Sequence, residues 1–240
     1  MKIAIISDIH SNLEALTAVR LEIEKEAVSQ VFCLGDMVGY NANPIEVLQM
    51  IQEMNAVCVA GNHDQAAVGM IGTDSFNEVA AAAAQWTMKQ LGPKEKAFLQ
   101  ALPLVRRIDE MTLVHATPDQ PQEWGYILSV DDARRSFQHL ESTYCFIGHS
   151  HLPGVFEEKR GLVFFHSGIF EFKTKERYII NVGSVGQPRD KNPKASFVIF
   201  DAAARTVDFR RVPYNIAQTQ RKILAAGLPE YLAQRLAVGR

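Results

Sequence analysis

The sequence has little cysteine, no excess of charge of one sign and no long hydrophobic run. Its 240 residues include three cysteines, Cys33, Cys58 and Cys145, and each stands within an apolar segment. An odd number of widely spaced cysteines fits neither a disulfide framework nor a zinc ribbon. We therefore expect buried thiols in a reducing compartment, which predicts a cytoplasmic protein.

Charge and hydropathy also exclude several classes of partner. The 25 basic and 27 acidic residues give a formal net charge of −2, and the lysines and arginines are spread along the chain. No basic strip follows a face or a segment, so stable nucleic-acid binding is not expected. The first apolar run, residues 1–8, is too short for a signal peptide or a membrane span, so we expect no membrane attachment.

The first half of the chain has the pattern of an α/β protein. Ile3–Ser7, Val31–Leu34 and Ala56–Ala60 are apolar runs typical of buried strands, and helical patterns separate them. This βαβαβ order predicts a parallel sheet with right-handed crossovers. A helical insertion is predicted at about residues 65–102. Its apolar stripe suits either core packing or a dimer face, which leaves a homo-oligomer open.

The second half changes in character. Strands are predicted at Met111–His115 and Tyr144–Ile147, and short runs between turn residues over 155–211 are typical of an antiparallel meander. Asn215–Ala237 is predicted to be helical. No linker or repeat divides the chain, so we expect one domain over residues 1–240, an α/β (α+β) fold with two sheets packed face to face.

Polar residues recur just beyond the carboxyl ends of the predicted strands, where open α/β sheets bind their ligands. These segments are Asp8-Ile-His10, Gly35-Asp36, Gly61-Asn62-His63-Asp64, His115 and Gly148-His149-Ser-His151. Residues two apart in extended backbone point the same way, so both Asp-x-His and His-x-His can face one cluster. The glycines allow sharp turns or close backbone approach.

Each motif alone also has a plain structural explanation. A strand-end aspartate is commonly a helix cap, a Gly-Asp pair is commonly a turn, and a single histidine is commonly part of a core. Those explanations do not predict a shared position at five strand ends. The coincidence therefore favours one common site.

Together, these ordered motifs resemble those of the calcineurin-like metallophosphoesterase superfamily. The matching positions are Asp8-x-His10, Gly35-Asp36-x-Val38-Gly39, Gly61-Asn62-His63-Asp64, His115 and Gly148-His149-x-His151. The segment Asn181–Asp190 further resembles the bacterial branch of small phosphodiesterases and diadenosine-tetraphosphatase-like proteins. The resemblance implies a four-layer sandwich in which two mixed β-sheets pack face to face between helices.

The resemblance also implies two metal centres that share a bridging carboxylate, Asp36. The first would consist of Asp8, His10, Asp36 and His151, and the second of Asp36, Asn62, His115 and His149. Carboxylate, amide and imidazole ligands without thiolate suit several divalent ions. We expect two such ions, with Mn²⁺ as the first choice and Fe, Zn²⁺ or Ni²⁺ as the alternatives.

A mechanism follows from such a pair of ions. They can clamp the attacking and leaving oxygens, and a hydroxide that bridges them would be the nucleophile. His63, which the resemblance does not assign to a metal, would protonate the leaving oxygen. Arg189 could grip phosphate or be a solvated loop residue. Tyr40 could stack on the substrate or pack beside the site, and neither His139 nor His166 receives a catalytic role.

The sequence therefore predicts a dinuclear metal-dependent phosphoester hydrolase that acts on a small phosphoester or nucleotide, as a phosphodiesterase or dinucleoside-polyphosphate hydrolase. The alternatives are a phosphomonoesterase, including a protein phosphatase, and an idle protein-binding scaffold of the same fold. The protein-phosphatase branch has Gly-Asp-x-Val-Asp-Arg-Gly, whereas this chain has Gly35-Asp-Met-Val-Gly39-Tyr40. The substitution argues against a protein phosphatase and leaves the orienting partner of His63 unidentified. Scaffolds typically lose a ligand or the catalytic histidine, and here every matched position is present.

Overall fold

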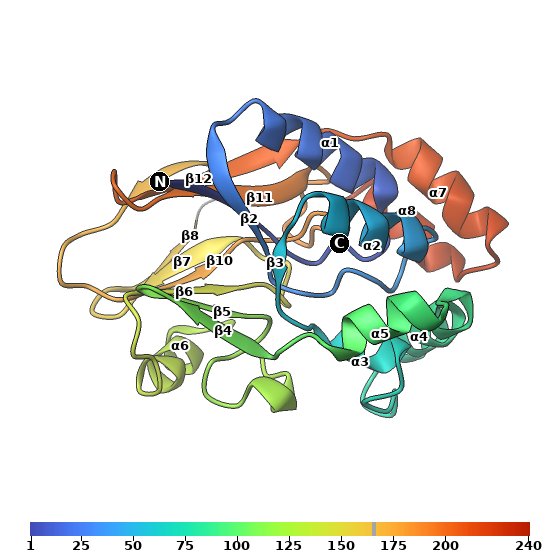
Figure 1. The fold of residues 1–240 in the computed structure, drawn as a ribbon, viewed down its shortest axis with the longest axis horizontal. Helices are drawn as coiled ribbons and strands as arrows, with labels where there is room; N and C mark the ends of the chain where they lie inside the picture. The colour runs from blue at the N-terminus through green and yellow to red at the C-terminus, as the bar shows by residue number, and fades with distance from the viewer. Residues whose placement is uncertain (165–166) are drawn as a thin grey trace.

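Two six-stranded β-sheets form the centre of the computed structural model, which describes residues 1–164 and 167–240 (Figure 1). In spatial order, the first sheet consists of β3 (Val57–Cys58), β2 (Val28–Cys33), β1 (Lys2–Ile6), β11 (Ala195–Asp201), β12 (Thr206–Val212) and β9 (Gly168–Glu171). The second consists of β4 (Val105–Ile108), β5 (Met111–Val114), β6 (Tyr144–Ile147), β10 (Tyr178–Asn181), β7 (Gly154–Glu157) and β8 (Gly161–Phe164).

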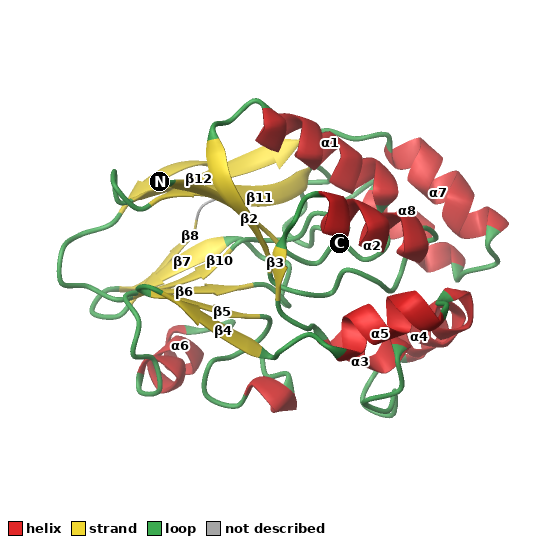
Figure 2. Ribbon diagram, viewed as in Figure 1, coloured by secondary structure: helices red, strands yellow, loops and turns green. Residues whose placement is uncertain are grey.

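The helices lie outside the two sheets (Figure 2). Along the chain they are α1 (Leu13–Glu24), α2 (Pro44–Glu53), α3 (Asn62–Ala67), α4 (Glu78–Gln90), α5 (Pro93–Gln100), α6 (Val130–Phe137), α7 (Ile216–Ala225) and α8 (Glu230–Leu236), with a short 3₁₀ turn at Pro121–Glu123. The arrangement confirms the predicted fold of two mixed sheets flanked by helices.

The layers form because the central strands are apolar on both faces. In β1, Ile3 and Ile5 lie in the core between the sheets, whereas Ala4 and Ile6 pack in the core that contains α1 and α2. Phe146 of β6 is likewise buried between the sheets, and the residues beside it pack with α6. Strands covered on both sides need such near-continuous hydrophobic runs. The four layers are therefore the helices α1 and α2, the first sheet, the second sheet and α6.

The parallel βαβαβ unit is confirmed. β2 pairs in parallel with β1, with Ile5 opposite Phe32, and β3 continues in parallel on the other side of β2. The third strand is shorter than the predicted Ala56–Ala60. Its end leaves the ladder because the Ala60 N–H donates to the carbonyl of Pro103, at 2.9 Å.

The predicted antiparallel meander is wrong. β7 and β8 do form an antiparallel hairpin, but β10 inserts between β6 and β7 and runs parallel to β6, with Tyr178 opposite Tyr144. β9, β11 and β12 belong to the other sheet, where β11 is antiparallel to β1. Turn residues and alternation mark where strands lie, but they do not specify the sheet that each strand joins.

The helical segments are also divided more finely than predicted. Residues 68–77 separate α3 from α4, and the C-terminal helix is broken at residues 226–229, where Gly227 has φ +70°. The alanine stripe of α4 packs against α7 and α8, since Ala83 lies in one cluster with Ile223 and Leu232. The stripe is therefore part of an internal core.

The three cysteines are buried thiols, as the sequence predicts. Burial raises the pKa of Cys145 well above its usual range, which keeps the thiol protonated. Over the residues that the structure describes, the helices are too short or too polar to cross a bilayer.

Replacing Phe146 with alanine should lower the free energy of unfolding by about 3–5 kcal/mol, because the ring is fully buried between the sheets. Urea denaturation measures the change. Ile169→Ala is the control, since that side chain is 61% exposed on β9 and should change stability little. A loss below about 1 kcal/mol for Phe146→Ala would mean that the two sheets are not packed as described.

Candidate metal centre

The polar segments predicted at five strand ends meet at one place. They follow β1, β2, β3, β5 and β6, and the two sheets bring these ends together. Backbone hydrogen bonds join the first two loops. The Asp8 N–H donates to the carbonyl of Gly35 at 3.1 Å, and the His10 N–H donates to the carbonyl of Asp36 at 2.9 Å. The position of each carboxylate therefore depends on the neighbouring loop.

These residues do not have the extended backbone that the sequence predicts. Five of them lie in the left-handed region, with φ values of 53° (Asp8), 49° (His10), 50° (Asp36), 64° (His149) and 60° (His151). That region costs a non-glycine residue about 1–2 kcal/mol. The paired side chains converge because each loop turns sharply, and such strain is concentrated at functional sites.

The first group of side chains consists of Asp8, His10 and His151, all buried. His151 Nε2 lies 3.1 Å from Asp8 Oδ1 and 3.1 Å from His10 Nε2. His10 Nε2 is also 3.8 Å from Asp8 Oδ1. Two imidazole nitrogens and a carboxylate oxygen thus face a common point.

The second group consists of Asp36, His115 and His149. His115 Nε2 lies 3.3 Å from Asp36 Oδ2 and 3.1 Å from His149 Nδ1. Asp36 Oδ2 is also 3.6 Å from His10 Nε2, so this carboxylate lies between the two groups. The amide oxygen of Asn62 is buried and has no hydrogen-bond partner among the described residues.

The other nitrogen of each ring contacts a backbone carbonyl. The pairs are His10 Nδ1 with Val38 O at 3.2 Å, His151 Nδ1 with Gln187 O at 2.5 Å, His115 Nδ1 with Leu34 O at 2.8 Å and His149 Nε2 with Trp124 O at 2.9 Å. A carbonyl only accepts, so these nitrogens carry the hydrogen. Burial lowers the pKa of His10 and of His151 and keeps both rings neutral, so the Nε2 atoms that these two rings turn toward each other at 3.1 Å both present lone pairs. A cation between them removes that repulsion, which is the arrangement of metal-binding histidines.

The charges of the site also call for cations. Burial opposes ionisation of Asp36, but the attraction of the neighbouring histidines, His115 foremost, together outweighs burial and holds the pKa of the carboxyl well below its usual range. Burial likewise opposes protonation of His115, yet the attraction of Asp36 raises the pKa of this histidine to about 9. Burial and the His115 charge lower the pKa of His149 to about 3. Two buried carboxylates thus attract positive charge strongly, and divalent ions fit the oxygen and imidazole donors.

Two glycines let the loops approach the carboxylates. A Cβ at Gly148 would overlap Ser7 Oγ and Asp8 Oδ2, and one at Gly61 would overlap Asp36 Oδ1. The prediction that glycine is needed for close approach is confirmed at these positions.

His63 lies directly beside the cluster, and together with His10 and Asp36 it makes a third group of close, buried side chains that could hold an ion. The centroid of the His63 ring is 4.4 Å from that of Tyr40 and 4.8 Å from that of Phe76, and its backbone N–H donates to Asp36 Oδ1 at 2.8 Å. Burial lowers the pKa of His63 to about 4. Its Nδ1 is buried and has no hydrogen-bond partner within the described ranges. Tyr40 is 6% exposed and packs on both His63 and His10.

Asp64 is a residue whose role the sequence analysis missed. Its buried carboxylate accepts from the N–H groups of Met37 at 2.9 Å, Val38 at 3.2 Å and Gly61 at 3.1 Å. It therefore ties the loops that carry Asp36 and His63 together. The available signal was the extra acidic residue at the end of Gly-Asn-His-Asp.

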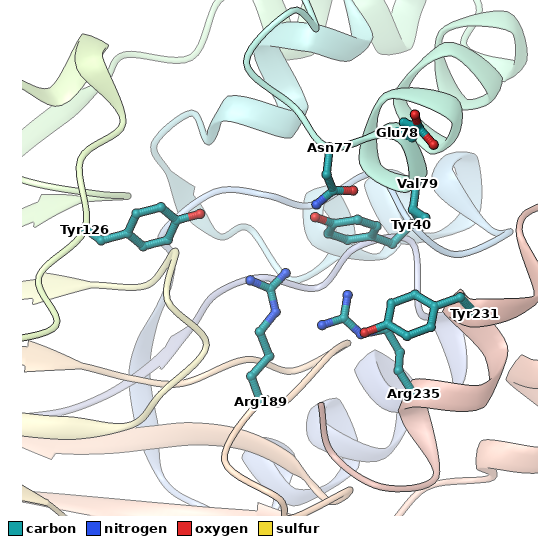
Figure 3. A pocket seen from close by; sticks show the side chains of 8 residues that line it. All are labelled: Tyr40, Asn77, Glu78, Val79, Tyr126, Arg189, Tyr231 and Arg235. Atoms are coloured by element: carbon teal, nitrogen blue, oxygen red, sulfur yellow. The ribbon is translucent and has the colours of Figure 1, made fainter.

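The cluster borders a cavity of about 230 Å³, whose lining includes Asn62, His63 and His149. Residues 75–77 and 80 also line it, so the helical segment at 65–102 covers part of the site. Arg189 lies farther out, beside a second cavity of about 520 Å³ (Figure 3). Of the two histidines without an assigned role, His139 is exposed after α6, and His166 lies outside the described residues.

Residues 1–205 match the model of the calcineurin-like phosphoesterase superfamily domain. The chain is similar to an uncharacterized protein of Methanocaldococcus jannaschii, with 42% identity over 246 positions that cover 99% of this chain and 98% of that one. A metallophosphoesterase from Sphaerobacter thermophilus has 39% identity and a TM-score of 0.90, over 100% of this chain and 99% of the other. A hypothetical protein from Pyrococcus horikoshii has the same fold, with 21% identity and a TM-score of 0.84, over 100% and 98% of the two chains.

Replacing Gly148 with alanine should lower the free energy of unfolding by about 1–3 kcal/mol and reduce the Mn²⁺ content, because the new Cβ must displace Asp8. Thermal unfolding and elemental analysis of the Mn²⁺-loaded protein measure the two effects. Gly72→Ala is the matched control, since its Cβ would meet only the end of the exposed Asp74 side chain. Unchanged metal content in Gly148→Ala would contradict the close approach of this loop to Asp8.

Proposed function

Because the chain belongs to the calcineurin-like phosphoesterase superfamily and is a phosphoester hydrolase, we propose that it uses two divalent cations to hydrolyse phosphodiesters or dinucleoside polyphosphates. The observation that carries the proposal is the position of Asp36, whose Oδ2 lies 3.6 Å from His10 Nε2 and 3.3 Å from His115 Nε2. One carboxylate between two sets of imidazoles suits a pair of ions that share a ligand.

The first ion would be held by Asp8, His10, Asp36 and His151, and the second by Asp36, Asn62, His115 and His149. The unpartnered Asn62 oxygen supports its inclusion, because a buried amide oxygen without a hydrogen bond is costly. When bound, two such ions supply Lewis acidity for the phosphoryl oxygens and generate the nucleophile from water. The donor set accepts several divalent ions, and among them we propose Mn²⁺ as the first choice, with Fe, Zn²⁺ or Ni²⁺ as the alternatives.

His63 is the proposed general acid for the leaving oxygen. It lines the smaller cavity with Asn62 and His149, so its ring borders the space available to substrate. Burial lowers its pKa to about 4, which leaves the ring neutral at pH 7. An anionic phosphoester beside it would raise that pKa again. The acid form would then be populated mainly in the complex with substrate.

The surroundings of His63 favour a small phosphoester over a phosphoprotein. A Cβ at position 39 would lie 2.7 Å from His63 Nδ1, so a side chain there would reach the imidazole directly. The protein-phosphatase pattern has an aspartate at this position, whereas this chain has glycine with φ +94°. His63 thus lacks the acidic partner of that branch, and Tyr40 replaces the arginine that binds phosphate there.

We also propose that the protein works in the cytoplasm. The support is the three buried thiols, which a reducing compartment preserves.

With added Mn²⁺, the protein should hydrolyse bis-p-nitrophenyl phosphate faster than p-nitrophenyl phosphate. His63→Ala should lower kcat by about a hundredfold or more on a dinucleoside phosphodiester, whose alkoxide leaving group needs a proton, because a general acid contributes about 10²–10⁴-fold, and should keep its Mn²⁺ content. The effect on bis-p-nitrophenyl phosphate should be smaller, because p-nitrophenolate leaves without a proton. His139→Ala is the control, since that histidine is exposed and away from the cluster. Loss of both metal and kcat would make His63 a ligand or a structural residue. No turnover with any divalent ion would favour the idle scaffold.

The wild type should bind two Mn²⁺ per chain, and Asp36→Asn should bind at most one, because the neutral amide removes the charge that both ions share. Isothermal titration calorimetry and elemental analysis measure the stoichiometry. Asp74→Asn removes an exposed carboxylate and should retain two ions. A wild-type stoichiometry of one, or two ions in Asp36→Asn, would contradict a shared ligand.

A further inference from the structure

The larger cavity, about 520 Å³ in volume, is lined by two arginines and three tyrosines (Figure 3). Arg189 comes from the loop that follows β10, and Arg235 comes from α8 with Tyr231. Tyr40 and Tyr126 belong to the loops that follow β2 and precede α6. In Figure 3 the guanidinium groups of both arginines point into the space between the tyrosine rings.

Neither guanidinium has an Asp or Glu side chain as a partner within residues 1–164 and 167–240. Arg189 donates to Gln187 Oε1 at 2.9 Å, and Arg235 donates to the main-chain oxygen of Arg240, the last residue of the sequence. Glu78 lines the same cavity, but no ion pair joins it to either arginine. The contacts that remain are with aromatic rings, since the Arg189 Cζ lies 5.9 Å from the Tyr40 centroid and the Arg235 Cζ 5.3 Å from that of Tyr231.

This arrangement concentrates positive charge on one wall of the cavity. Burial, together with repulsion from Arg189, lowers the pKa of Arg235 from its usual value. Two partly buried arginines that share no carboxylate are therefore unfavourable neighbours on their own. An anion between them would relieve the repulsion, and a guanidinium fork matches phosphate oxygens.

The cavity is continuous with the edge of the metal cluster. It shares Tyr40, Asn77 and Tyr126 with the smaller cavity, which reaches His63 and His149. A ligand that fills both would therefore have one phosphoryl group at the cluster and another part beside the arginines. Tyr126 and Tyr231 are 49% and 53% exposed, although one face of Tyr126 stacks on His149 with the ring centroids 4.1 Å apart. The exposed part of each ring can contact an aromatic group of the ligand.

The residues of α8 also lie beyond the segment shared with the superfamily. The family match ends at residue 205, whereas Tyr231 and Arg235 follow it by more than twenty residues. The ligands and His63 all lie within the matched segment. Because the catalytic residues lie inside the matched segment and α8 lies outside it, α8 can select the substrate without taking part in the reaction.

We propose that Arg189 and Arg235 form a second anion subsite, which binds a phosphoryl group of the same substrate at a distance from the one that is hydrolysed. The substrate class is then a nucleoside polyphosphate ester, with its non-scissile phosphates on the arginines and its base against Tyr231 or Tyr126. The inference rests on the proposed function, because it names the substrate of that site. It makes Arg235 a specificity-determining residue.

The test compares two substrates in the presence of Mn²⁺. Diadenosine tetraphosphate carries additional phosphates, whereas bis-p-nitrophenyl phosphate carries none. Arg235→Met should lower the ratio of kcat/KM for diadenosine tetraphosphate to that for bis-p-nitrophenyl phosphate by about tenfold or more, through the loss of a charge-assisted contact. Arg221→Met, an exposed arginine of α7 that does not line this cavity, should leave the ratio unchanged.

A change of less than about twofold in that ratio, including an equal fall for both substrates, overturns the proposal. Arg235→Lys retains the charge without the fork, and an intermediate ratio supports phosphate recognition. If circular dichroism shows that Arg235→Met does not fold, Arg235→Lys takes its place in this test.

If the wild type hydrolyses neither ester, that result contradicts the proposed function but does not test the anion subsite. Calorimetry then tests the subsite by measuring binding. In Mn²⁺-loaded protein, Arg235→Met or Arg235→Lys should weaken ADP binding by about tenfold and by more than it weakens orthophosphate binding. Equal effects on the two probes would mean that the arginines bind free phosphate, which overturns the inference. Unchanged ADP affinity overturns it as well.

Discussion

The structure around the cluster depends on placing two carboxylates, Asp8 and Asp36, in an interior that excludes water. A buried carboxylate remains ionised only where positive charge and hydrogen-bond donors surround it closely. Histidines, backbone N–H groups and the proposed cations meet that requirement from five separate loops. Glycine at 61 and 148 is a consequence of the same requirement, because a larger residue would occupy the space that the carboxylates need.

The layers of the fold explain how five loops can meet this requirement together. Parallel strands of both sheets end at the same side of the molecule, so residues that are far apart in the chain arrive next to one another. The cores between and outside the sheets hold the strands in fixed register. The left-handed backbone of Asp8 and Asp36 is stabilised by this framework and by the hydrogen bonds between loops. Rigidity near the site thus comes from hydrophobic packing farther away.

Much of this arrangement could be predicted from the sequence, because strand ends and motif residues leave a local signal. The apolar runs located both ends of β1 and β6 within about one residue and the end of β2 equally well, although they missed its first three residues, and the polar segments after these strands converge as expected. β9 was not predicted as a strand, and the sheet to which β10 belongs could not be predicted, because a short apolar run between turns does not specify its neighbouring strands. The carbonyls of Val38 and Trp124 fix imidazole orientation without any side-chain signal. Arg235 could not be associated with the site, because only the packing of α8 against α4 brings it there.

The hydrogen bonds from the four imidazoles to backbone carbonyls bear on which metal ion the enzyme would bind. They determine which nitrogen faces inward, but nitrogen and oxygen donors of this kind accept most first-row transition ions, and their affinities follow the general Irving–Williams order. Donors of this kind therefore exclude none of manganese, iron, nickel and zinc, although manganese comes lowest in that order of affinity. The ion that occupies the proposed site would then depend on the relative abundance of those metals where the chain folds as well as on affinity, so the same polypeptide made in two hosts could be isolated with different metals.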